Sequence, residues 1–342
     1  TWMAWERKRG KLHELNRLLR GATDTTFTPV GSDHIHIPEY IKYVVTLDED
    51  TQLTRGVIKK LIGKMVHPLN TPLFDRIKRR IVKGHGILQP KVTPLMPSNG
   101  NGSWYQFIFS SPGGIDPYVS SSSDVYQDLY DEGSYTGKGI YDIDAFESAL
   151  KSRVPANRLL SHDLFEGIFA RAGFACDVEV LESYPRSYHA DINRLHRWTR
   201  GDWQLLPWLL GIVNGTGKIP TLGRWKIIDN LRRSLVQPCL FLTLILSFSF
   251  PLYQAILLWI MVFSILAAPI IIHLLLLFIS YRRSQGRIVT HLKMWLSDVL
   301  LSFVNCFFIL AFLPDKSLKI LDALVRTLLR MAFTQKHLLQ WV

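Results

Sequence analysis

The chain has 342 residues, 48% of them hydrophobic, and a formal net charge of +12 with a pI of about 9.6. Such a charge is compatible with nucleic acid, anionic lipid or an anionic substrate as a partner. The sequence contains no nucleic-acid-binding motif, and many basic residues stand beside long apolar runs, as they do at the cytoplasmic ends of membrane helices. We therefore expect membrane lipid, and no nucleic acid, as a partner. The three cysteines are far apart and form no CxxC or Cys/His pair, which argues against a disulfide scaffold or a zinc site.

The first half of the chain predicts alternating helices and strands. Leucines at helical spacing indicate a helix over 5–20, and the β-branched run 40–47 indicates a buried strand that ends at the acidic residues 48–50. A helical pattern at 53–66 and a short strand at 86–92 follow. Because strand, helix and strand in this order are typical of a parallel α/β sheet, we expect a ligand to bind at the edge where the acidic residues lie.

The second half of the chain predicts helices that contact a membrane. Residues 225–233 form a basic amphipathic stretch suited to the headgroup region. The apolar runs 235–250 and 252–280 predict a hairpin of two spans separated by Pro251, since roughly 20 apolar residues cross a bilayer. Arginines at both ends of this hairpin place those ends in the cytosol by the positive-inside rule.

A third apolar run, 295–313, is expected to end at Pro314, and the following segment, 318–342, is amphipathic and basic. These two segments either span and return, or lie re-entrant or along the interface. We expect a cytosolic terminus because basic residues continue nearly to the end. The chain thus divides into an α/β unit at 1–223 and interfacial and transmembrane helices at 224–342.

The acidic triplet Asp48-Glu49-Asp50 is a candidate metal site. Alternate carboxylates at a strand end can share one divalent cation such as Mg²⁺ or Mn²⁺, which keeps coordination positions free for diphosphate oxygens. The cation then offsets negative charge on a leaving nucleotide. A solvated acidic turn is the common alternative, so the triplet alone does not decide the function.

The motif Ser161-His162-Asp163 stands at the start of a helical pattern over 163–172. A carboxylate beside a sugar hydroxyl can remove its proton while the oxygen attacks an anomeric carbon, which is general-base catalysis. The same residues could instead cap the helix, with His162 as a hydrogen-bonded core residue. In isolation, capping is the simpler interpretation.

The segment 195–204, with the sequence LHRWTRGDWQ, combines arginine and tryptophan. Arginines can neutralise a diphosphate, and tryptophan can supply a flat wall to a sugar. The alternative is a Trp/Arg belt at a membrane interface, and both interpretations are compatible with a position just before the apolar half.

TLDEDT, SHD and HRWTRGDWQ, in this order and followed by apolar helices, resemble the D-x-D, TED and Q-x-x-R-W series of cellulose-synthase-like processive glycosyltransferases. Longer blocks, at 5–21, 86–94, 123–147 and 158–173, look still more like the glycosyltransferase portion of cyclic β-1,2-glucan synthases. This resemblance covers nearly the whole chain. It departs from the motifs where Arg194 stands for the Gln of Q-x-x-R-W and where SHD stands for TED.

The resemblance implies an α/β fold of the GT-A (Rossmann-like) type, with its first strand upstream of the sequence given and further domains in a larger parent chain. Asp48 and Asp50 would bind Mg²⁺ or Mn²⁺ and the UDP, and Asp163 would be the catalytic base. The other implied donor-binding residues are Arg9, Lys11, Asn16, Arg197 and Arg200, and the implied acceptor-binding residues are Gly137, Lys138, His162 and Trp198.

The activity implied by the resemblance is inverting transfer of glucose from UDP-glucose to a growing β-1,2-glucan. The implied location is the bacterial inner (plasma) membrane, with the catalytic domain in the cytosol. Residue chemistry alone supports only a metal-dependent inverting sugar transferase, so a cellulose- or hyaluronan-synthase-like enzyme is the alternative. A non-catalytic membrane module is a further alternative, whereas a transporter is disfavoured because His273 is the single plausible ionisable group in the apolar run 235–279.

Overall fold

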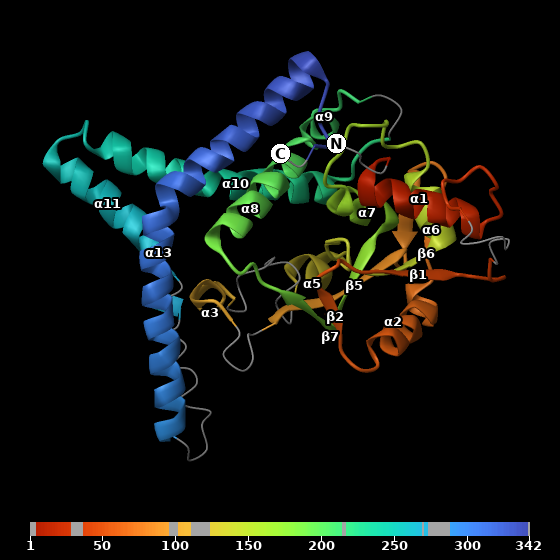
Figure 1. Cartoon of the computed structure of the whole chain (residues 1–342), viewed down its shortest axis with the longest axis horizontal. Coiled ribbons are helices and arrows are strands. Elements are labelled where there is room, and N and C mark those ends of the chain that lie inside the picture. Colours follow the sequence, from red (N-terminus) through yellow and green to blue (C-terminus); the bar gives the residue numbers. More distant parts are fainter. Residues whose placement is uncertain are drawn as a thin grey trace.

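The computed structural model describes residues 5–28, 37–95, 102–110, 124–213, 217–268, 270–272 and 288–340. Within these ranges a mixed α/β body is joined to a hairpin of apolar helices and to one long C-terminal helix (Figure 1). The predicted α/β class is confirmed.

A five-stranded sheet with the strand order β1-β6-β5-β7-β2 forms the centre of the α/β body. Its strands are β1 (Tyr43–Thr46), β2 (Thr51–Leu53), β5 (Ile87–Leu95), β6 (Gly139–Asp142) and β7 (Ala172–Ser183). β5 and β7 are parallel, but β6 is antiparallel to both β1 and β5, and β2 is antiparallel to β7. The prediction of a parallel sheet is therefore wrong for β6 and β2.

The position of β1 also differs from the prediction. The strand expected over 40–47 forms at 43–46, where it is an edge strand with side chains that are mostly half-buried. Thr46 pairs with Gly139 in the β1–β6 ladder. Because β6 runs against β1, residues that precede β6 lie at the same edge of the sheet as residues that follow β1.

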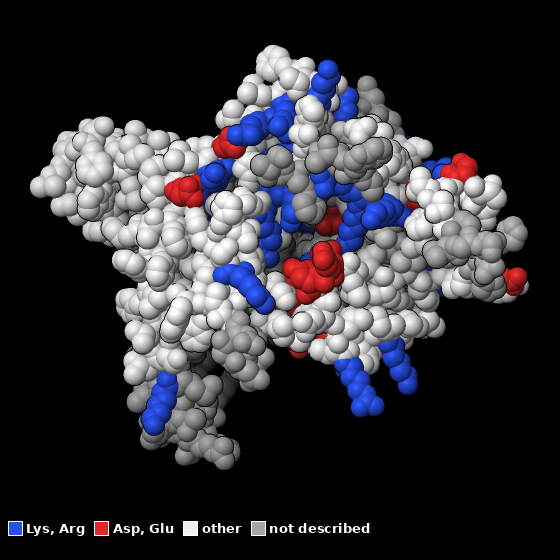
Figure 2. Space-filling model, viewed as in Figure 1, with Lys and Arg blue, Asp and Glu red and all other residues white. Residues whose placement is uncertain are grey.

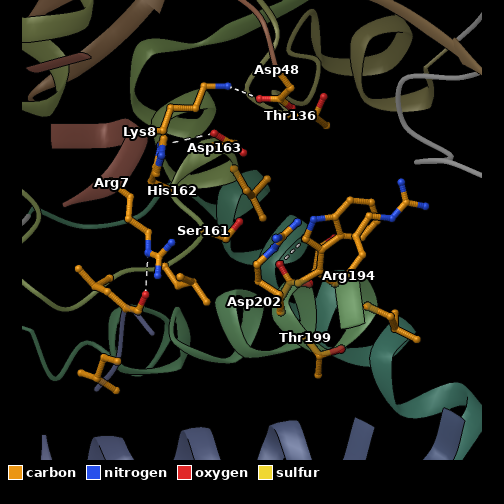
Figure 3. Close-up of a pocket in the computed structure, with 18 of the residues that line it drawn as sticks. Arg7, Lys8, Asp48, Thr136, Ser161, His162, Asp163, Arg194, Thr199 and Asp202 are labelled. Atoms are coloured by element: carbon orange, nitrogen blue, oxygen red, sulfur yellow. Dashed lines mark hydrogen bonds and ion pairs between the residues drawn. The ribbon is translucent and has the colours of Figure 1, made fainter. Parts of the chain in front are cut away.

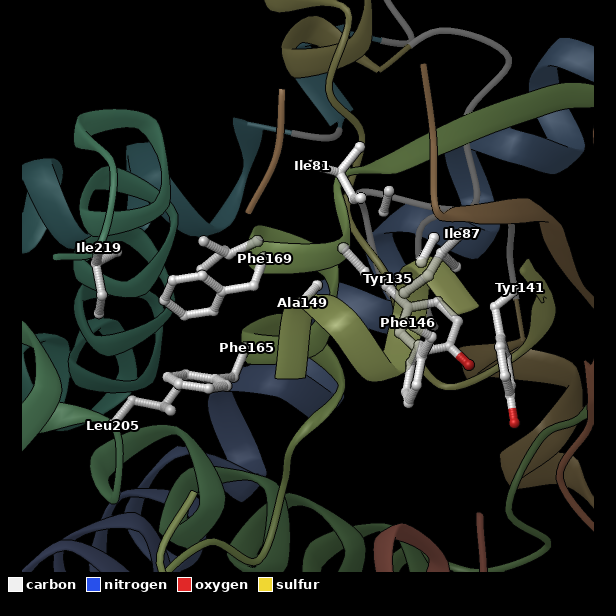
Figure 4. Packing of buried hydrophobic residues seen from close by; sticks show 14 of the residues in the cluster. Ile81, Ile87, Tyr135, Tyr141, Phe146, Ala149, Phe165, Phe169, Leu205 and Ile219 are labelled. Carbon is white, nitrogen blue, oxygen red and sulfur yellow. The ribbon is translucent and has the colours of Figure 1, made fainter. Parts of the chain in front are cut away.

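Helices cover both faces of the sheet. On one face, α2 (Val57–Val66) buries Val57, Leu61 and Met65, a helical spacing that the sequence predicted. On the other face, α6 (Ile143–Leu150) and α7 (Asp163–Ala170) pack into the main core, where Figure 4 shows the rings of Phe165 and Phe169. Each such side chain contributes about 1.5–3 kcal/mol on full burial, so these two clusters fix the sheet between its helices.

The remaining elements surround this three-layer body. They are α1 (Arg7–Leu19), η1 (Pro68–Asn70), the hairpin β3 (Leu73–Asp75) and β4 (Arg80–Lys83), α3 (Trp104–Phe109), α5 (Val125–Tyr130), α8 (Tyr188–Trp203) and α9 (Leu206–Leu209). The helix predicted at 5–20 is thereby confirmed as α1.

The apolar half begins with one continuous helix, α10 (Thr221–Ser247), in place of separate interfacial and spanning segments. Ile227 and Leu231 of α10 belong to the main core, so this core extends past residue 223. A turn at 248–251 leads into α11 (Leu252–Leu266), which contacts α10 as the predicted hairpin requires. Residues 273–287 lie outside the described ranges, so the second span stays a prediction.

The C-terminal helix α13 (Ile288–Leu329) continues through Pro314, where the sequence predicted an end. Proline removes one backbone donor and bends a helix without always ending it, and Figure 1 shows α13 bent along its length. A π-helical turn, η2 (Arg330–Thr334), follows. Among the described residues, the stretch Trp295–Thr334 is the one helix long and apolar enough to cross a membrane, and its most apolar 18 residues have a mean hydropathy of 2.2.

Candidate active site

A cavity of about 2010 Å³ opens at the edge of the sheet where β1 ends. Its walls come from α1, the turn after β1, the loops before β6 and α7, α8, the first half of α10 and the segment 335–340. Figure 2 shows acidic residues in a hollow on this face, bordered by lysines and arginines. A small-molecule site usually has roughly 300–1,000 Å³, so this cavity has room for more than one ligand.

Asp48 lies at this edge between two lysines. Lys8 Nζ is 2.5 Å from Asp48 Oδ1, and Lys138 Nζ is 2.9 Å from Asp48 Oδ2. The buried ammonium group of Lys138 also lies 3.1 Å from Glu182 Oε2, at the end of β7. Burial tends to raise the pKa of Asp48, but Lys138 and Lys8 more than offset this, and its pKa lies below the ordinary value. Asp48 is therefore held as an anion at the cavity wall.

The mixed direction of the sheet explains this arrangement. Asp48 follows β1, and Lys138 immediately precedes β6, the antiparallel neighbour of β1. A parallel strand in the place of β6 would put its preceding loop at the opposite edge. The antiparallel strand thus supplies a cation to the acidic turn.

Asp163 is the first residue of α7 and lies close to His162 and Glu166. Figure 3 shows Asp163 beside His162. His162 Nδ1 is 3.4 Å from Asp163 Oδ1 and 2.8 Å from Glu166 Oε1. A Cβ atom at Gly137 would lie 2.9 Å from Asp163 Oδ1, so the glycine permits a close approach of the loop before β6. Asp163 lines the same cavity as Asp48.

Two groups of side chains could attract a cation. Asp48 and Asp50 are carboxylates on the cavity wall, and oxygen ligands of this kind suit Mg²⁺ or Mn²⁺. Among the described residues, His162, Asp163 and Glu166 also bring their ligand atoms within 4.8 Å of one another. Because Mg²⁺ and Mn²⁺ prefer oxygen ligands, we interpret the carboxylate turn as the metal-binding candidate and the group around the His162 imidazole as a charge network.

The helix α8 supplies a basic and aromatic wall. The guanidinium of Arg194 lies 4.7 Å from the centre of the Trp198 ring, and it donates a hydrogen bond of 3.1 Å to Asp191. Tyr105 of α3 donates a second hydrogen bond of 2.8 Å to Asp191. Trp198 is 39% exposed and lines the cavity. Arg194 thus fixes one face of a tryptophan ring whose remaining surface faces the cavity space.

The next arginine along α8, Arg197, is also part of this wall. Arg197 lines the cavity and is half-buried. Burial and the neighbouring Arg194 lower its pKa, and Asp48 and Asp50 partly offset them. The acidic turn and this arginine therefore act on each other across the cavity.

The last described residues form another wall. Arg200 of α8 donates a hydrogen bond of 2.8 Å to the carbonyl of Gln340, and Gln204 donates one of 2.9 Å to that of Leu338. Gln204 also accepts a hydrogen bond of 2.6 Å from the backbone N–H of Leu160. The segment 335–340 is thereby tied to α8 and to the loop before α7, where the sequence predicted an amphipathic membrane helix.

The structure brings most of the predicted site residues to one cavity. Those that line it are Lys11, Asp48, Asp50, Lys138, His162, Asp163, Arg197 and Trp198. Gly137 packs directly against Asp163.

Three predicted donor-binding residues make other contacts. Arg9 pairs with Glu6. Asn16 is buried, where its amide donates to Glu147 and accepts from the hydroxyl of Tyr141. Arg200 holds the segment 335–340 as described above. None of the three lines the cavity, and their predicted roles in donor binding stay predictions.

Sequence reasoning missed Lys8, Glu166, Glu182 and the segment 335–340. Lys8 stood in a block that resembles the synthases, but no pattern distinguished it from the neighbouring basic residues. Glu166 carried a usable signal, since it is an acidic residue amid the apolar positions of α7. Glu182 reaches the site through strand pairing, because it lies opposite Thr51, the residue after Asp50.

No protein-family model matches the chain. Over 343 aligned residues, and along its whole length, the chain is 43% identical to the cyclic beta-(1,2)-glucan synthase NdvB of Rhizobium meliloti (strain 1021). It spans 12% of the length of that protein. The resemblance predicted from the sequence blocks is thereby confirmed. The chain is homologous to one segment of a cyclic β-(1,2)-glucan synthase.

Proposed function

We propose that this chain is the glycosyltransferase unit of a glucan synthase, and that it transfers glucose from UDP-glucose to a growing β-1,2-glucan with inversion. The observation that carries the proposal is a single cavity lined by the Asp48–Asp50 turn, Asp163, Arg197 and Trp198. Similarity to a protein named as a cyclic beta-(1,2)-glucan synthase supports the choice of glucan and linkage.

The donor would bind at the basic and acidic end of the cavity. Lys8, Lys138 and Arg197 provide cationic groups for a diphosphate, and charge-assisted hydrogen bonds to phosphate oxygens are among the stronger polar contacts. Asp48 keeps these lysines in place through its two carboxylate oxygens. We place the nucleotide diphosphate here because its phosphate oxygens can bind the same cationic groups that now pair with Asp48.

The acceptor end of the glucan would lie between Trp198 and Asp163. The exposed part of the Trp198 ring offers an apolar face to a sugar ring. Asp163 would take the proton from the acceptor hydroxyl as that oxygen bonds to the anomeric carbon and the bond to the UDP oxygen breaks. Attack from the face opposite the leaving group inverts the anomeric configuration.

The acidic turn fits a divalent cation, because Asp48 is held ionised and Asp50 lines the cavity beside it. Mg²⁺ or Mn²⁺ bound by these carboxylates would offset the charge that develops on the leaving diphosphate. Lys8 and Lys138 would then share the charge of Asp48 with the cation. We also propose that the protein lies in the bacterial inner membrane with its catalytic site in the cytosol. The long apolar helix and the basic residues near its ends support this location.

The decisive experiment supplies radiolabelled UDP-glucose to membranes that carry the full-length parent protein and determines the linkage of the product. We expect β-1,2-linked glucan. The Asp163→Asn variant should make no polymer and should still bind UDP. A product with another β-linkage would replace the linkage assignment with that of a cellulose- or hyaluronan-synthase-like enzyme, and synthesis by Asp163→Asn would remove Asp163 as the base.

A further inference from the structure

Glu166 is an ionisable residue buried among apolar side chains, and this burial raises the pKa of its carboxyl above the ordinary value, although His162 opposes the shift. It lies on α7 between Phe165 and Ile168, both of which belong to the main core, and its own exposed fraction is 2%. Burial of an ionised carboxylate costs several kcal/mol unless a partner compensates. The ion-pair partner of Glu166 therefore indicates its role.

That partner is the imidazole of His162. The Nδ1 atom of His162 is 2.8 Å from Glu166 Oε1 and 3.4 Å from Asp163 Oδ1, so one ring nitrogen lies within ion-pair distance of two carboxylates. Among the described residues, His162 Nδ1, Asp163 Oδ1 and Glu166 Oε2 are all buried without a hydrogen bond of good geometry, so ion pairing holds this cluster together. The imidazole is the group that links the buried carboxylate to the one on the cavity wall.

The charges around His162 favour its protonated form. Burial lowers the pKa of His162, but Glu166 and Asp163 more than offset this, and its pKa lies above the ordinary value. The other ionisable groups that act on this network are Arg9 of α1, Tyr135 of the loop before β6 and Tyr141 of β6. Arg9 opposes the protonated form more weakly than the two carboxylates favour it.

Asp163 is also confined from the opposite direction. Gly137 has a φ of +85°, and a Cβ atom there would lie 2.9 Å from Asp163 Oδ1 and 3.0 Å from Oδ2. The carboxylate is thus packed between the backbone of the loop before β6 and the ring of His162. Its orientation depends on both.

We infer that Glu166 and His162 are positioning residues for Asp163: the buried carboxylate anchors the imidazole, and the imidazole orients the carboxylate that faces the cavity. The inference rests on the proposed function, in which Asp163 is the base. Neither residue takes the acceptor proton, which goes to Asp163. Their contribution is a fixed geometry and a cation beside the base.

The experiment uses the full-length parent in membranes with radiolabelled UDP-glucose. Glu166→Gln keeps the size and one acceptor oxygen of the side chain but removes its charge. Because the imidazole then loses its nearest anion and its proton, Asp163 loses a neighbouring cation and is protonated more readily. We expect kcat to fall by about tenfold to hundredfold, as loss of precise positioning does. The KM for UDP-glucose should stay within about twofold of the wild-type value, because Glu166 does not touch the donor site.

The pH–rate profile distinguishes a positioning role of Glu166 and His162 from a purely structural one. In Glu166→Gln the acidic limb of the profile should move to higher pH, and His162→Asn should move it in the same direction. The double variant should be no slower than the slower single variant, since the two residues act as one unit. The control is Glu39→Gln, an exposed glutamate outside the cavity, which should leave rate and profile unchanged.

The outcomes distinguish this inference from the proposed function. If the wild-type parent makes no glucan from UDP-glucose, the proposed function is overturned, and the inference with it. If the parent is active and Glu166→Gln keeps both its kcat and its acidic limb, the inference is wrong and the function stands. If Glu166→Gln does not accumulate, His162→Asn supplies the same measurement: a shifted limb supports the inference, and an unshifted limb overturns it.

Discussion

The backbone of Gly137 lies against the carboxylate of Asp163, so closely that a single added methyl group at residue 137 would be 2.9 Å from Asp163 Oδ1. The φ of +85° at Gly137 is itself unfavourable for other residues. The loop before β6 therefore sets how far the proposed base reaches into the cavity.

Gly137→Ala should displace the Asp163 carboxylate and lower kcat by about tenfold to hundredfold, since small misplacements of a catalytic group have effects of this size. The affinity for UDP should change little. The measurement is glucan synthesis and UDP binding by the full-length parent. Gly21→Ala is the matched control, because Gly21 has a φ of +87° but nothing within 4 Å of the added atom. Equal losses of activity in both variants would show that backbone strain alone is responsible.

Lys138→Met should destabilise the protein, because it leaves the buried carboxylate of Glu182 without its ion-pair partner. Removal of one member of a buried pair costs about 3–5 kcal/mol. We expect protease resistance to be lost at a lower temperature than in the wild-type protein. The double variant Lys138→Met/Glu182→Gln should partly restore that temperature. Lys59→Met removes an exposed lysine and should leave the transition in place. An unaltered transition in Lys138→Met would mean that the pair contributes no net stability.

Removal of divalent cations should abolish glucan synthesis, and added Mg²⁺ or Mn²⁺ should restore it. Asp50→Asn removes one of the two proposed ligands, so the cation concentration for half-maximal activity should rise by about tenfold or more. Asp177→Asn, an exposed change on β7 outside the cavity, serves as the control. Full activity in the presence of a chelator would remove the metal from the proposed mechanism.

Arg200→Ala should release the segment 335–340 from α8. Hydrogen bonds from a charged donor contribute about 1.5–3 kcal/mol each, and Arg200 donates to the carbonyl of Gln340 from a buried position. We expect faster proteolysis near residue 336 with UDP affinity retained, because Arg200 lies outside the cavity lining. A large loss of UDP affinity with unchanged proteolysis would favour the donor-binding role that the sequence predicted for Arg200.

Lys226 should make stability depend on pH in the alkaline range. Burial lowers the pKa of Lys226 to about 8, although Glu132 and Asp124 partly oppose the shift. The unfolded chain then binds more protons than the folded one between about pH 8 and 10, so this group stabilises the fold progressively as pH rises. The wild-type protein should gain about 1–3 kcal/mol relative to Lys226→Met over this range, and parallel pH curves of the two proteins would contradict this expectation.

Local patterns in the sequence predicted the elements that are built locally. The helices at α1, α2 and α7 follow from the spacing of apolar residues, and the strand before Asp48 follows from a β-branched run. Strand direction did not follow, because it depends on pairing between residues far apart, such as Thr46 and Gly139. The contact of Lys138 with Asp48 depends on that pairing and was therefore not predictable from the chain order.

Prolines were the second source of error. Pro314 and Pro238 both lie inside helices, although the rule that proline ends a helix predicted a stop at the first of them. Pro90 and Pro94 lie within β5. This strand pairs with β6 only at Ile87 and Leu88, so its later residues form no backbone hydrogen bonds with β6 that a proline could interrupt. The helices thus continue through proline, whereas the prolines of β5 stand where no pairing with β6 is lost.

The helix α10 enters the core through Ile227 and Leu231, donates from Lys226 to the carbonyls of Glu132 and Gly133, and continues without interruption to Ser247. One helix consequently joins the α/β body to the apolar hairpin. Asn230, Arg233 and Gln237 of α10 line the cavity, so we expect a tilt of the hairpin to move this wall and to couple the two halves of the chain where the hydropathy changes.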